Sequence, residues 1–206
     1  MSLSITIVII AITVLVSFAS FNNEELNYKL PFSPYLAKHE NEWWRVISHA
    51  FVHADHMHLF FNMYVLYNFG SLIESTLIVS YGDFSGGLYY VTLYLGGIIF
   101  ATLPSLKKHA DNQMYRSVGA SGAVSAVLFA FIMVYPKVPL NLMFIPIDIP
   151  AYIMGALYLA FETYSNSNRN SNIAHDAHLA GAVFGILFMI VLNVDTLPRF
   201  IQQIGL

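Results

Sequence analysis

A serine flanked by glycines stands near the start of an apolar stretch and could act as a nucleophile. Ser121 lies in the run Gly119-Ala120-Ser121-Gly122, and the residues that follow as far as Ala130 are apolar except Ser125. A serine hydroxyl attacks a carbonyl only when a base takes its proton, and neutral histidine, with a pKa of about 6.5, suits that task. Small residues are also common where membrane helices pack closely, so the run taken alone fits a packing role as well.

Three other polar side chains would complete an acyl-transfer site if they met Ser121. His178 is the candidate base, while His58 and Asn62, one helical turn apart, offer N–H donors for a developing oxyanion. The backbone N–H of Ser121, near a helix N-terminus, adds a further donor. Asp176 lies two positions before His178, about 200° away around a helix, so we expect a serine–histidine dyad without an acid.

The composition places these residues in a membrane protein. The chain has 206 residues, of which 57% are hydrophobic and 10% charged, and its mean hydropathy is +0.61. Soluble domains carry about 25% charged residues, so this much apolar surface requires a lipid solvent. The net charge of -3 does not suggest a nucleic-acid partner. The lack of cysteine excludes disulfides and thiolate chemistry.

The apolar stretches are each about as long as the 20 residues that cross a bilayer. We predict an all-α polytopic membrane protein, a six-transmembrane-helix bundle that forms one domain over residues 1–206. The spans are expected at about 3–21, 58–80, 86–106, 118–135, 144–164 and 173–194. The segment between the first two spans is rich in aromatic residues, as interfacial segments are. Residues 165–172 are expected to form a flexible loop.

The parity of the spans puts the polar candidates on one side of the membrane. The second, fourth and sixth spans run in the same direction, and His58, Asn62, Ser121 and His178 all lie in their first turns. Polar residues inside a span usually face one another or a cavity, so these four predict a wet pocket. Small residues recur every four positions on the fourth and sixth spans and favour close approach. They are Gly122, Ala126 and Ala130, and Ala177, Gly181 and Gly185.

The order of these motifs resembles that of the rhomboid family of intramembrane serine proteases, in its minimal six-helix form. The matching residues are Trp44-Arg45, the run His49-x3-His53-x4-His58-x3-Asn62, the GASG around Ser121, AHLAG at Ala177–Gly181, and Gly70 and Glu74. The resemblance implies hydrolysis of peptide bonds in or near the transmembrane segments of single-pass membrane proteins. The lipid bilayer is the setting, and no cofactor, metal or nucleic acid is expected.

The resemblance also implies a role for individual residues. Ser121 becomes the nucleophile, His178 the base, and His58 and Asn62, with the Ser121 N–H, the oxyanion hole. Structural or motif roles fall to Trp44, Arg45, His53, Gly119, Gly122 and Gly181. Rhomboids often carry an aromatic residue four positions after the nucleophile, where this chain has Ser125. The residue that supports the His178 ring is therefore not identified from the sequence.

The resemblance and the charge pattern imply opposite orientations. The family implies a bacterial inner-membrane protein whose active site opens to the extracytoplasmic side. Loops on the active-site side carry most of the cations, namely Lys29, Lys38, Arg45, Lys107, Lys108, Arg116 and Arg169, against Lys137 and Arg199 opposite. The positive-inside rule would make the first group cytoplasmic. We follow the resemblance, because three of those charges lie in a long loop where the rule is weaker.

Two other functions remain open. Histidines at 49, 53, 56 and 58, with His175 and His178, could form a metal site, as in a His-rich metal-binding protein or metal-dependent enzyme. A non-catalytic rhomboid-like binder of transmembrane helices is the other alternative.

The fifth span lacks a stripe of small residues and is the one best suited to move and admit substrate. Its bulky Tyr152, Leu159 and Phe161 are expected to contact the second span, and trimming Phe161 is expected to weaken this closure.

Overall fold

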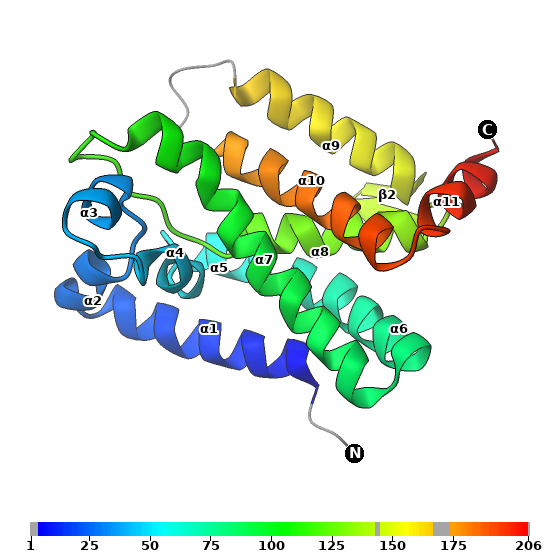
Figure 1. Ribbon diagram of the computed structural model, residues 1–206, viewed down its shortest axis with the longest axis horizontal. Helices are drawn as coiled ribbons and strands as arrows, with labels where there is room; N and C mark the ends of the chain where they lie inside the picture. Colours follow the sequence, from blue (N-terminus) through cyan, green and yellow to red (C-terminus); the bar gives the residue numbers. More distant parts are fainter. Residues whose placement is uncertain (1–3, 143–144, 167–173, 206) are drawn as a thin grey trace.

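The computed structural model describes residues 4–142, 145–166 and 174–205 (Figure 1). Its helical elements are α1 (Ile5–Phe21), α2 (Glu24–Lys29), α3 (Pro34–His39), α4 (Arg45–Ser48), the 3-10 turn η1 (His49–Phe51), α5 (His56–Val65), the π-helical turn η2 (Leu66–Gly70), α6 (Ser71–Tyr81), α7 (Asp83–His109), α8 (Ser121–Val134), α9 (Ala151–Asn166), α10 (His175–Leu192) and α11 (Thr196–Ile204). Two strands, β1 (Pro139–Leu142) and β2 (Ile145–Pro150), form an antiparallel hairpin.

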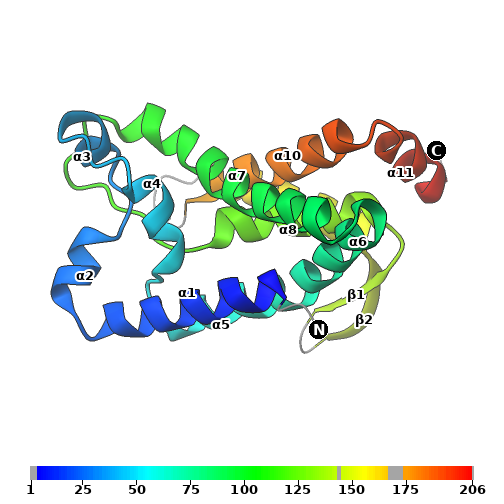
Figure 2. The same cartoon turned by 60° about the horizontal axis from the view of Figure 1, so that its bottom comes forward.

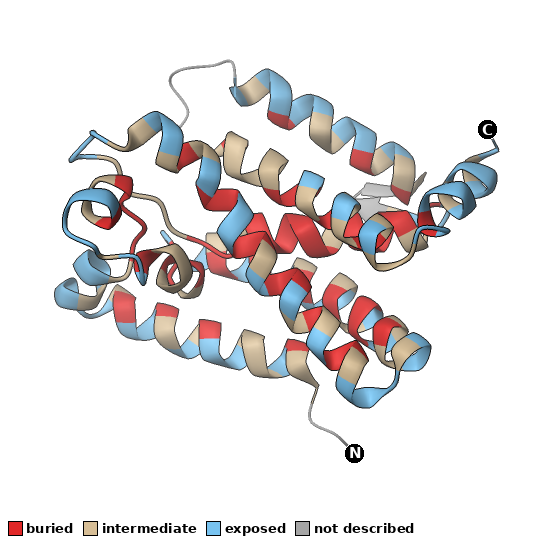
Figure 3. Cartoon of the chain, viewed as in Figure 1, coloured by how far each residue is buried: buried red, intermediate tan, exposed pale blue. Residues whose placement is uncertain are grey.

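Helix α8 forms the centre of the bundle. All of its residues from Gly122 to Met133 except Leu128 are buried, and it contacts α7, α9, α10 and η2 (Figure 3). A helix that is apolar on every side is stable only when other helices cover it. The serine at its first position, Ser121, is therefore held by a helix that its neighbours cover on nearly every side.

Small residues set the spacing between α8 and α10, as the sequence predicts. A Cβ added at Gly181 would overlap the carbonyl oxygen of Gly122, and one at Gly185 would overlap that of Ala126. Helix α7 also approaches α8 closely, since a Cβ at Gly97 would lie 2.8 Å from that of Ala126. Backbones this close leave no room for side chains between them, so α10 is brought directly against the start of α8.

The second span is one run of helix with a change of winding in its middle. The Asp55 side chain caps α5 by accepting a hydrogen bond from the His58 N–H at 2.8 Å. The π-helical turn η2 follows. Helix α6 comes next, and its residue Glu74 points toward the start of α1. There Glu74 accepts hydrogen bonds from the backbone N–H groups of Ile5 (2.6 Å) and Thr6 (2.9 Å). A buried carboxylate thus caps a helix N-terminus, where its charge is favourable.

The region after α8 differs from the expected helix over 144–164. Residues Ile145–Pro150 form strand β2, and helix α9 begins only at Ala151. Pro146 and Pro150 explain the difference, because proline lacks an N–H donor and disfavours helical geometry in the residue before it. After the last expected span, Thr196–Ile204 forms the amphipathic helix α11. The expected loop at 165–172 lies mostly outside the described residues.

The elements divide between two ends of the bundle. Helices α2, α3 and α4 lie at one end, and α11 and the hairpin lie toward the other (Figures 1 and 2). Within the described residues, α7 and α10 are long and apolar enough to cross a membrane. Helices α1 and α8 are apolar but shorter. The first residue of α8 lies toward the end formed by α2, α3 and α4.

Candidate active site

The loop between α1 and α5, residues 22–55, holds the chain just before Ser121. Phe32 and Ser117 exchange two backbone hydrogen bonds, at 2.9 and 3.0 Å. The Gly119 N–H donates to the carbonyl of His49 at 3.0 Å. The Ala120 N–H donates to the ring Nε2 of His53 at 3.3 Å. These bonds satisfy buried backbone donors and fix the approach to α8.

Arg45 organises that loop from inside. Its side chain is 1% exposed and donates to the backbone carbonyls of Tyr28 (3.0 Å) and Pro31 (2.9 Å), while its Nε donates to Glu42 at 2.5 Å. A guanidinium has several donors in a fixed plane, which suits it to tying distant segments together. Trp44, by contrast, is 55% exposed, and its ring faces outward from the loop.

His53 and His49 are buried as neutral rings. The ring of His53 donates from Nδ1 to Ser17 Oγ at 3.0 Å, because its Nε2 accepts from Ala120. Burial is the main cause that lowers the pKa of His53 to about 3 and that of His49 to about 4. Both rings therefore stay uncharged at neutral pH, and His53 keeps the lone pair that holds Ala120.

Glycine is required at position 119. Its φ of +113° is a conformation that side chains disfavour, and a Cβ there would lie 2.6 Å from Cε1 of His58. The ring of His58 therefore lies directly against the backbone that leads into Ser121. Gly181 is explained instead by the contact between α8 and α10, and Gly122 by the close approach of α7, where an added Cβ would overlap that of Ala101.

Ser121 and His178 meet as expected from the small-residue stripes. Ser121 Oγ lies 2.8 Å from Nε2 of His178, across the contact between α8 and α10. This distance allows direct proton transfer between a nucleophile and its base. Asp176 plays no part in this contact, because its carboxylate accepts the N–H of Ala177 at 2.9 Å.

A carboxylate that the sequence analysis did not select lies on the far side of the His178 ring. Glu162 of α9 accepts from Nδ1 of His178 at 3.0 Å and from Nδ1 of His175 at 2.6 Å. Glu162 is only 4% exposed to solvent. The expectation that no acid faces this histidine was wrong. The signal was present in the sequence, because Glu162 is the one charged residue between Ala151 and Tyr164.

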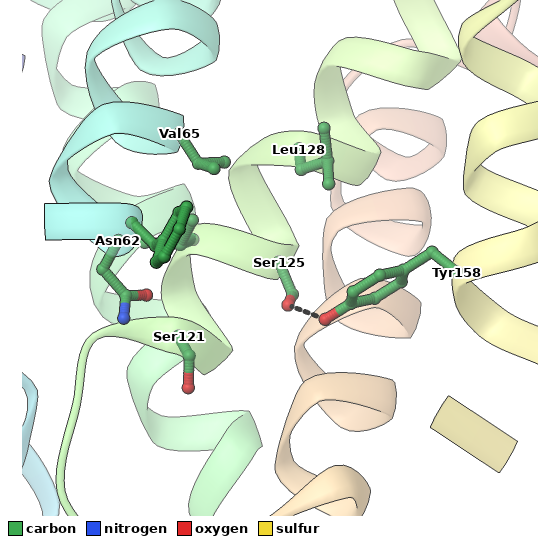
Figure 4. A pocket seen from close by; sticks show the side chains of 8 residues that line it. Asn62, Val65, Ser121, Ser125, Leu128 and Tyr158 are labelled. Atoms are coloured by element: carbon green, nitrogen blue, oxygen red, sulfur yellow. Dashed lines mark hydrogen bonds between the residues drawn. The ribbon is translucent and has the colours of Figure 1, made fainter. Parts of the chain in front are cut away.

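The aromatic support that the sequence analysis could not find also comes from α9. The ring of Tyr158 stacks toward that of His178, with centroids 6.5 Å apart and planes at 29°. Its hydroxyl lies 2.9 Å from Ser125 Oγ (Figure 4). Ser125 thus occupies the position where a ring was expected and instead anchors a ring from the neighbouring helix.

A small, mostly apolar pocket adjoins Ser121. Its volume is about 160 Å³ and it lies between α5, α8 and α9 (Figure 4). The lining residues are Phe61, Asn62, Val65, Ser121, Val124, Ser125, Leu128 and Tyr158. Asn62 and Ser121 lie at the end away from Val65 and Leu128. Phe161 does not line it and is 61% exposed, so the expected closure of Phe161 against the second span is not found, and Tyr158 is the residue of α9 that lines the pocket.

Of the candidate oxyanion donors, Asn62 and Ser121 line this pocket, and only the Asn62 amide is engaged by another acceptor. Asn62 Nδ2 donates to the carbonyl of His58 in its own helix at 2.9 Å. The Nδ1 of His58 accepts a long hydrogen bond of 3.5 Å from Ala54, which leaves its proton on Nε2. As the first residue of α8, Ser121 has a backbone N–H without an acceptor inside the helix.

One group of side chains could hold a metal ion within the described part of the chain. The ligand atoms of Glu162, His175 and His178 all lie within 4.8 Å of one another. The histidines of the first loop do not form such a group there. His49 bonds the carbonyl of Arg45, and the ring of His56, at the start of α5, is tilted against that of Phe21 with centroids 4.5 Å apart.

Comparison with known proteins gives consistent matches. The sequence model of the Rhomboid domain family matches residues 40–194 of this chain. RHOMBOID-like protein 12, mitochondrial, of Arabidopsis thaliana is 31% identical over 152 residues, which cover 66% of this chain and 43% of that protein. Rhomboid protein 1, mitochondrial, of Saccharomyces cerevisiae is 29% identical over 143 residues, 69% of this chain and 40% of that protein.

A further relative is similar in length to this chain. The rhomboid protease GlpG of Haemophilus influenzae is 26% identical over 191 residues, which cover 89% of this chain and 88% of that protein. This chain therefore spans less than half the length of the mitochondrial relatives but most of the length of the bacterial one.

Proposed function

Because this chain belongs to the rhomboid family of membrane-integral proteins, we propose that it is an intramembrane serine endopeptidase. Ser121 is the nucleophile and His178 the general base. The observation that carries the proposal is the 2.8 Å contact between Ser121 Oγ and His178 Nε2, beside a pocket that could receive a substrate side chain. A non-catalytic binder would have no need of this pairing.

The chemistry follows from the positions of the two side chains. Ser121 Oγ bonds to the carbonyl carbon as its proton passes to His178 Nε2, and the carbonyl electron pair moves onto the oxygen. The Ser121 N–H, the Asn62 amide and the His58 ring stabilise that oxyanion once Asn62 turns from the His58 carbonyl. The C–N bond then breaks and the leaving amine takes the proton from His178. Water repeats the sequence and releases the acid.

We further propose that residues 1–206 form one domain with six membrane spans. These are α1, the run α5–η2–α6, α7, α8, α9 and α10. Substrates are single-pass membrane proteins that enter beside the pocket between α5 and α9 and unwind locally. The site opens to the extracytoplasmic side of a bacterial inner membrane. The match to the Haemophilus influenzae protein over most of both chains supports a bacterial membrane. The matches to mitochondrial relatives support an organelle membrane as the alternative.

The direct test is cleavage of a generic single-pass substrate in detergent or liposomes. Ser121→Ala and His178→Ala should each abolish turnover, and the double variant should be no worse, because the two residues act as a unit. Ser75→Ala is the matched control, since its hydroxyl bonds only its own helix at Ser71. A fluorophosphonate probe should label the wild type at Ser121. Turnover by Ser121→Ala above the no-enzyme background would refute the assignment.

A further inference from the structure

We propose that Glu162 is a positioning residue for the base, so that the unit is Ser121–His178–Glu162 rather than a dyad. His175 holds the carboxylate from its other side. This inference rests on the proposed protease function and adds to it a residue from α9. It also extends the site to a helix that carries neither the nucleophile nor the base.

The hydrogen bonds define which ring nitrogen carries the proton. A carboxylate can only accept, so both Nδ1 atoms that face Glu162, at 3.0 Å for His178 and 2.6 Å for His175, are donors. With its proton on Nδ1, a neutral His178 has its lone pair on Nε2, where Ser121 Oγ lies at 2.8 Å. Glu162 thus selects the tautomer that the reaction needs.

The arrangement does more than join two helices. A buried carboxylate must be paired, and His175 alone, 2.6 Å from one oxygen, would join α9 to α10. The second oxygen faces the ring that contacts the nucleophile. Tyr158, one turn earlier on the same face of α9, stacks toward that ring as well. One face of α9 therefore supplies both the ring and the carboxylate that constrain His178.

The chemical role follows from the charge that develops during the reaction. When Ser121 Oγ bonds to the carbonyl carbon, its proton moves to Nε2 and the His178 ring becomes positively charged. The Nδ1 proton remains on the ring and is donated to the Glu162 carboxylate, which stays ionised and stabilises that charge. The proton on Nε2 later leaves with the amine. No proton needs to move onto Glu162 at any step.

The informative substitution is Glu162→Gln. Glutamine presents one oxygen and one NH2 group, so one of the two histidines must accept a hydrogen bond and shift its proton to Nε2. Whichever ring shifts, His178 loses the negative charge that stabilises its protonated form. We expect kcat to fall by about 100-fold or more, with KM within about threefold of wild type. Glu162→Asp keeps the charge and should restore part of the loss. Thr163→Val is the control, because the Thr163 hydroxyl bonds only its own helix, at Leu159.

A spectroscopic readout makes the test independent of turnover. In protein labelled with 15N-histidine, the wild type should show two far-downfield imidazole N–H signals from Nδ1–H groups bonded to a carboxylate. His175→Gln identifies one of them, and Glu162→Gln should lose the signal of His178. If the wild type cleaved no substrate, the proposed function would fail while these signals still tested the tautomer.

Three outcomes would overturn the inference. In the first, Glu162→Gln keeps wild-type kcat and lowers only the thermal midpoint, which would mean that Glu162 merely joins α9 to α10. In the second, the two Nδ1–H signals are absent from the wild type. The third is stoichiometric zinc in the purified protein that a chelator removes together with activity, since two imidazoles and a carboxylate are also a zinc ligand set.

Discussion

At the scale of single residues, the His178 ring is constrained by side chains that lie far from it in the sequence. Tyr158 faces one side of the ring and Glu162 accepts from its Nδ1, while Ser121 lies at its Nε2. A small residue at position 125 leaves room for Tyr158 and anchors its hydroxyl. The aromatic ring that orients the His178 base therefore comes from α9 instead of α8.

The oxyanion donors give the first prediction. Asn62→Ala and His58→Ala should each lower kcat without abolishing it, because the Ser121 N–H remains at the helix N-terminus. Loss of one such donor typically costs about 2.7–4 kcal/mol in the transition state. The rate is measured on the single-pass substrate, with Asn68→Ala as control, since that amide bonds only its own helix at Tyr64. Wild-type rates in both variants would contradict the proposed pocket.

The buried first-loop histidines give a prediction for pH. Unfolded rings take up protons near pH 6.5, whereas folded His49 and His53 do so only near pH 4 and pH 3. The unfolded state therefore binds more protons between these values, and the free energy of unfolding should fall as the pH drops from about 6.5 to about 4. Thermal midpoints in detergent across this range provide the measurement.

The variant His53→Gln isolates the contribution of one ring. Glutamine can still accept from Ala120 but does not titrate, so its thermal midpoint should depend less steeply on pH than that of the wild type. His56→Gln serves as the control because His56 is exposed. Parallel curves for His53→Gln and wild type would show that His53 is not buried as a neutral ring.

At the scale of helices, the contact between α8 and α10 has no spare room. Gly181→Ala should force these helices apart, because the new methyl group overlaps the Gly122 carbonyl. We expect a loss of about 1–3 kcal/mol in stability and a larger loss of activity, since the same contact brings Ser121 to His178. Gly87→Ala is the control, because its Cβ would meet only the flexible end of Ile5 at 3.1 Å. Equal thermal midpoints for the two variants would contradict this packing.

The gap between α5 and α9 gives a second prediction at this scale. Phe61 lines the pocket from α5, and Phe161 is exposed on α9 next to Glu162. A Phe61→Cys and Phe161→Cys pair, joined by a bifunctional crosslinker, should stop cleavage of a transmembrane substrate. A small fluorophosphonate should still label Ser121, because it needs no opening of the helices. Full cleavage with the crosslink verified would mean that substrate enters elsewhere.

Short motifs and parity predict much of the site, and packing decides the rest. Ser121, His178, His58 and Asn62 lie at helix starts, where direction and depth follow from counting spans. The hydrogen bond between Glu162 and His178 depends on the rotation of α9 about its own axis. No local sequence pattern predicts that rotation. Strand β2 was missed because residues 145–150 are mostly apolar and were counted toward the length of the fifth span. Pro146 and Pro150 prevent these residues from forming a helix.

At the scale of the whole molecule, the orientation in the membrane can be tested directly, because the chain contains no cysteine. Asp111 lies in the α7–α8 connection and Lys137 just before the hairpin, on opposite sides of the proposed bundle, and both are exposed. With the site facing outward, a membrane-impermeant maleimide should label Asp111→Cys in intact bacterial cells and Lys137→Cys only after lysis. The reverse pattern would support the orientation favoured by the positive charges.

The π-helical turn η2 links the two ends of the second span through chain length. Asn62 faces the candidate site before the turn, and Glu74 caps α1 after it. Each residue of an α-helix advances the chain by about 100°, so a one-residue deletion in Leu66–Gly70 would rotate one of these side chains away from its target. An insertion would do the same in the opposite sense. The number of residues in this turn, more than their identity, determines whether a single helix can serve both places.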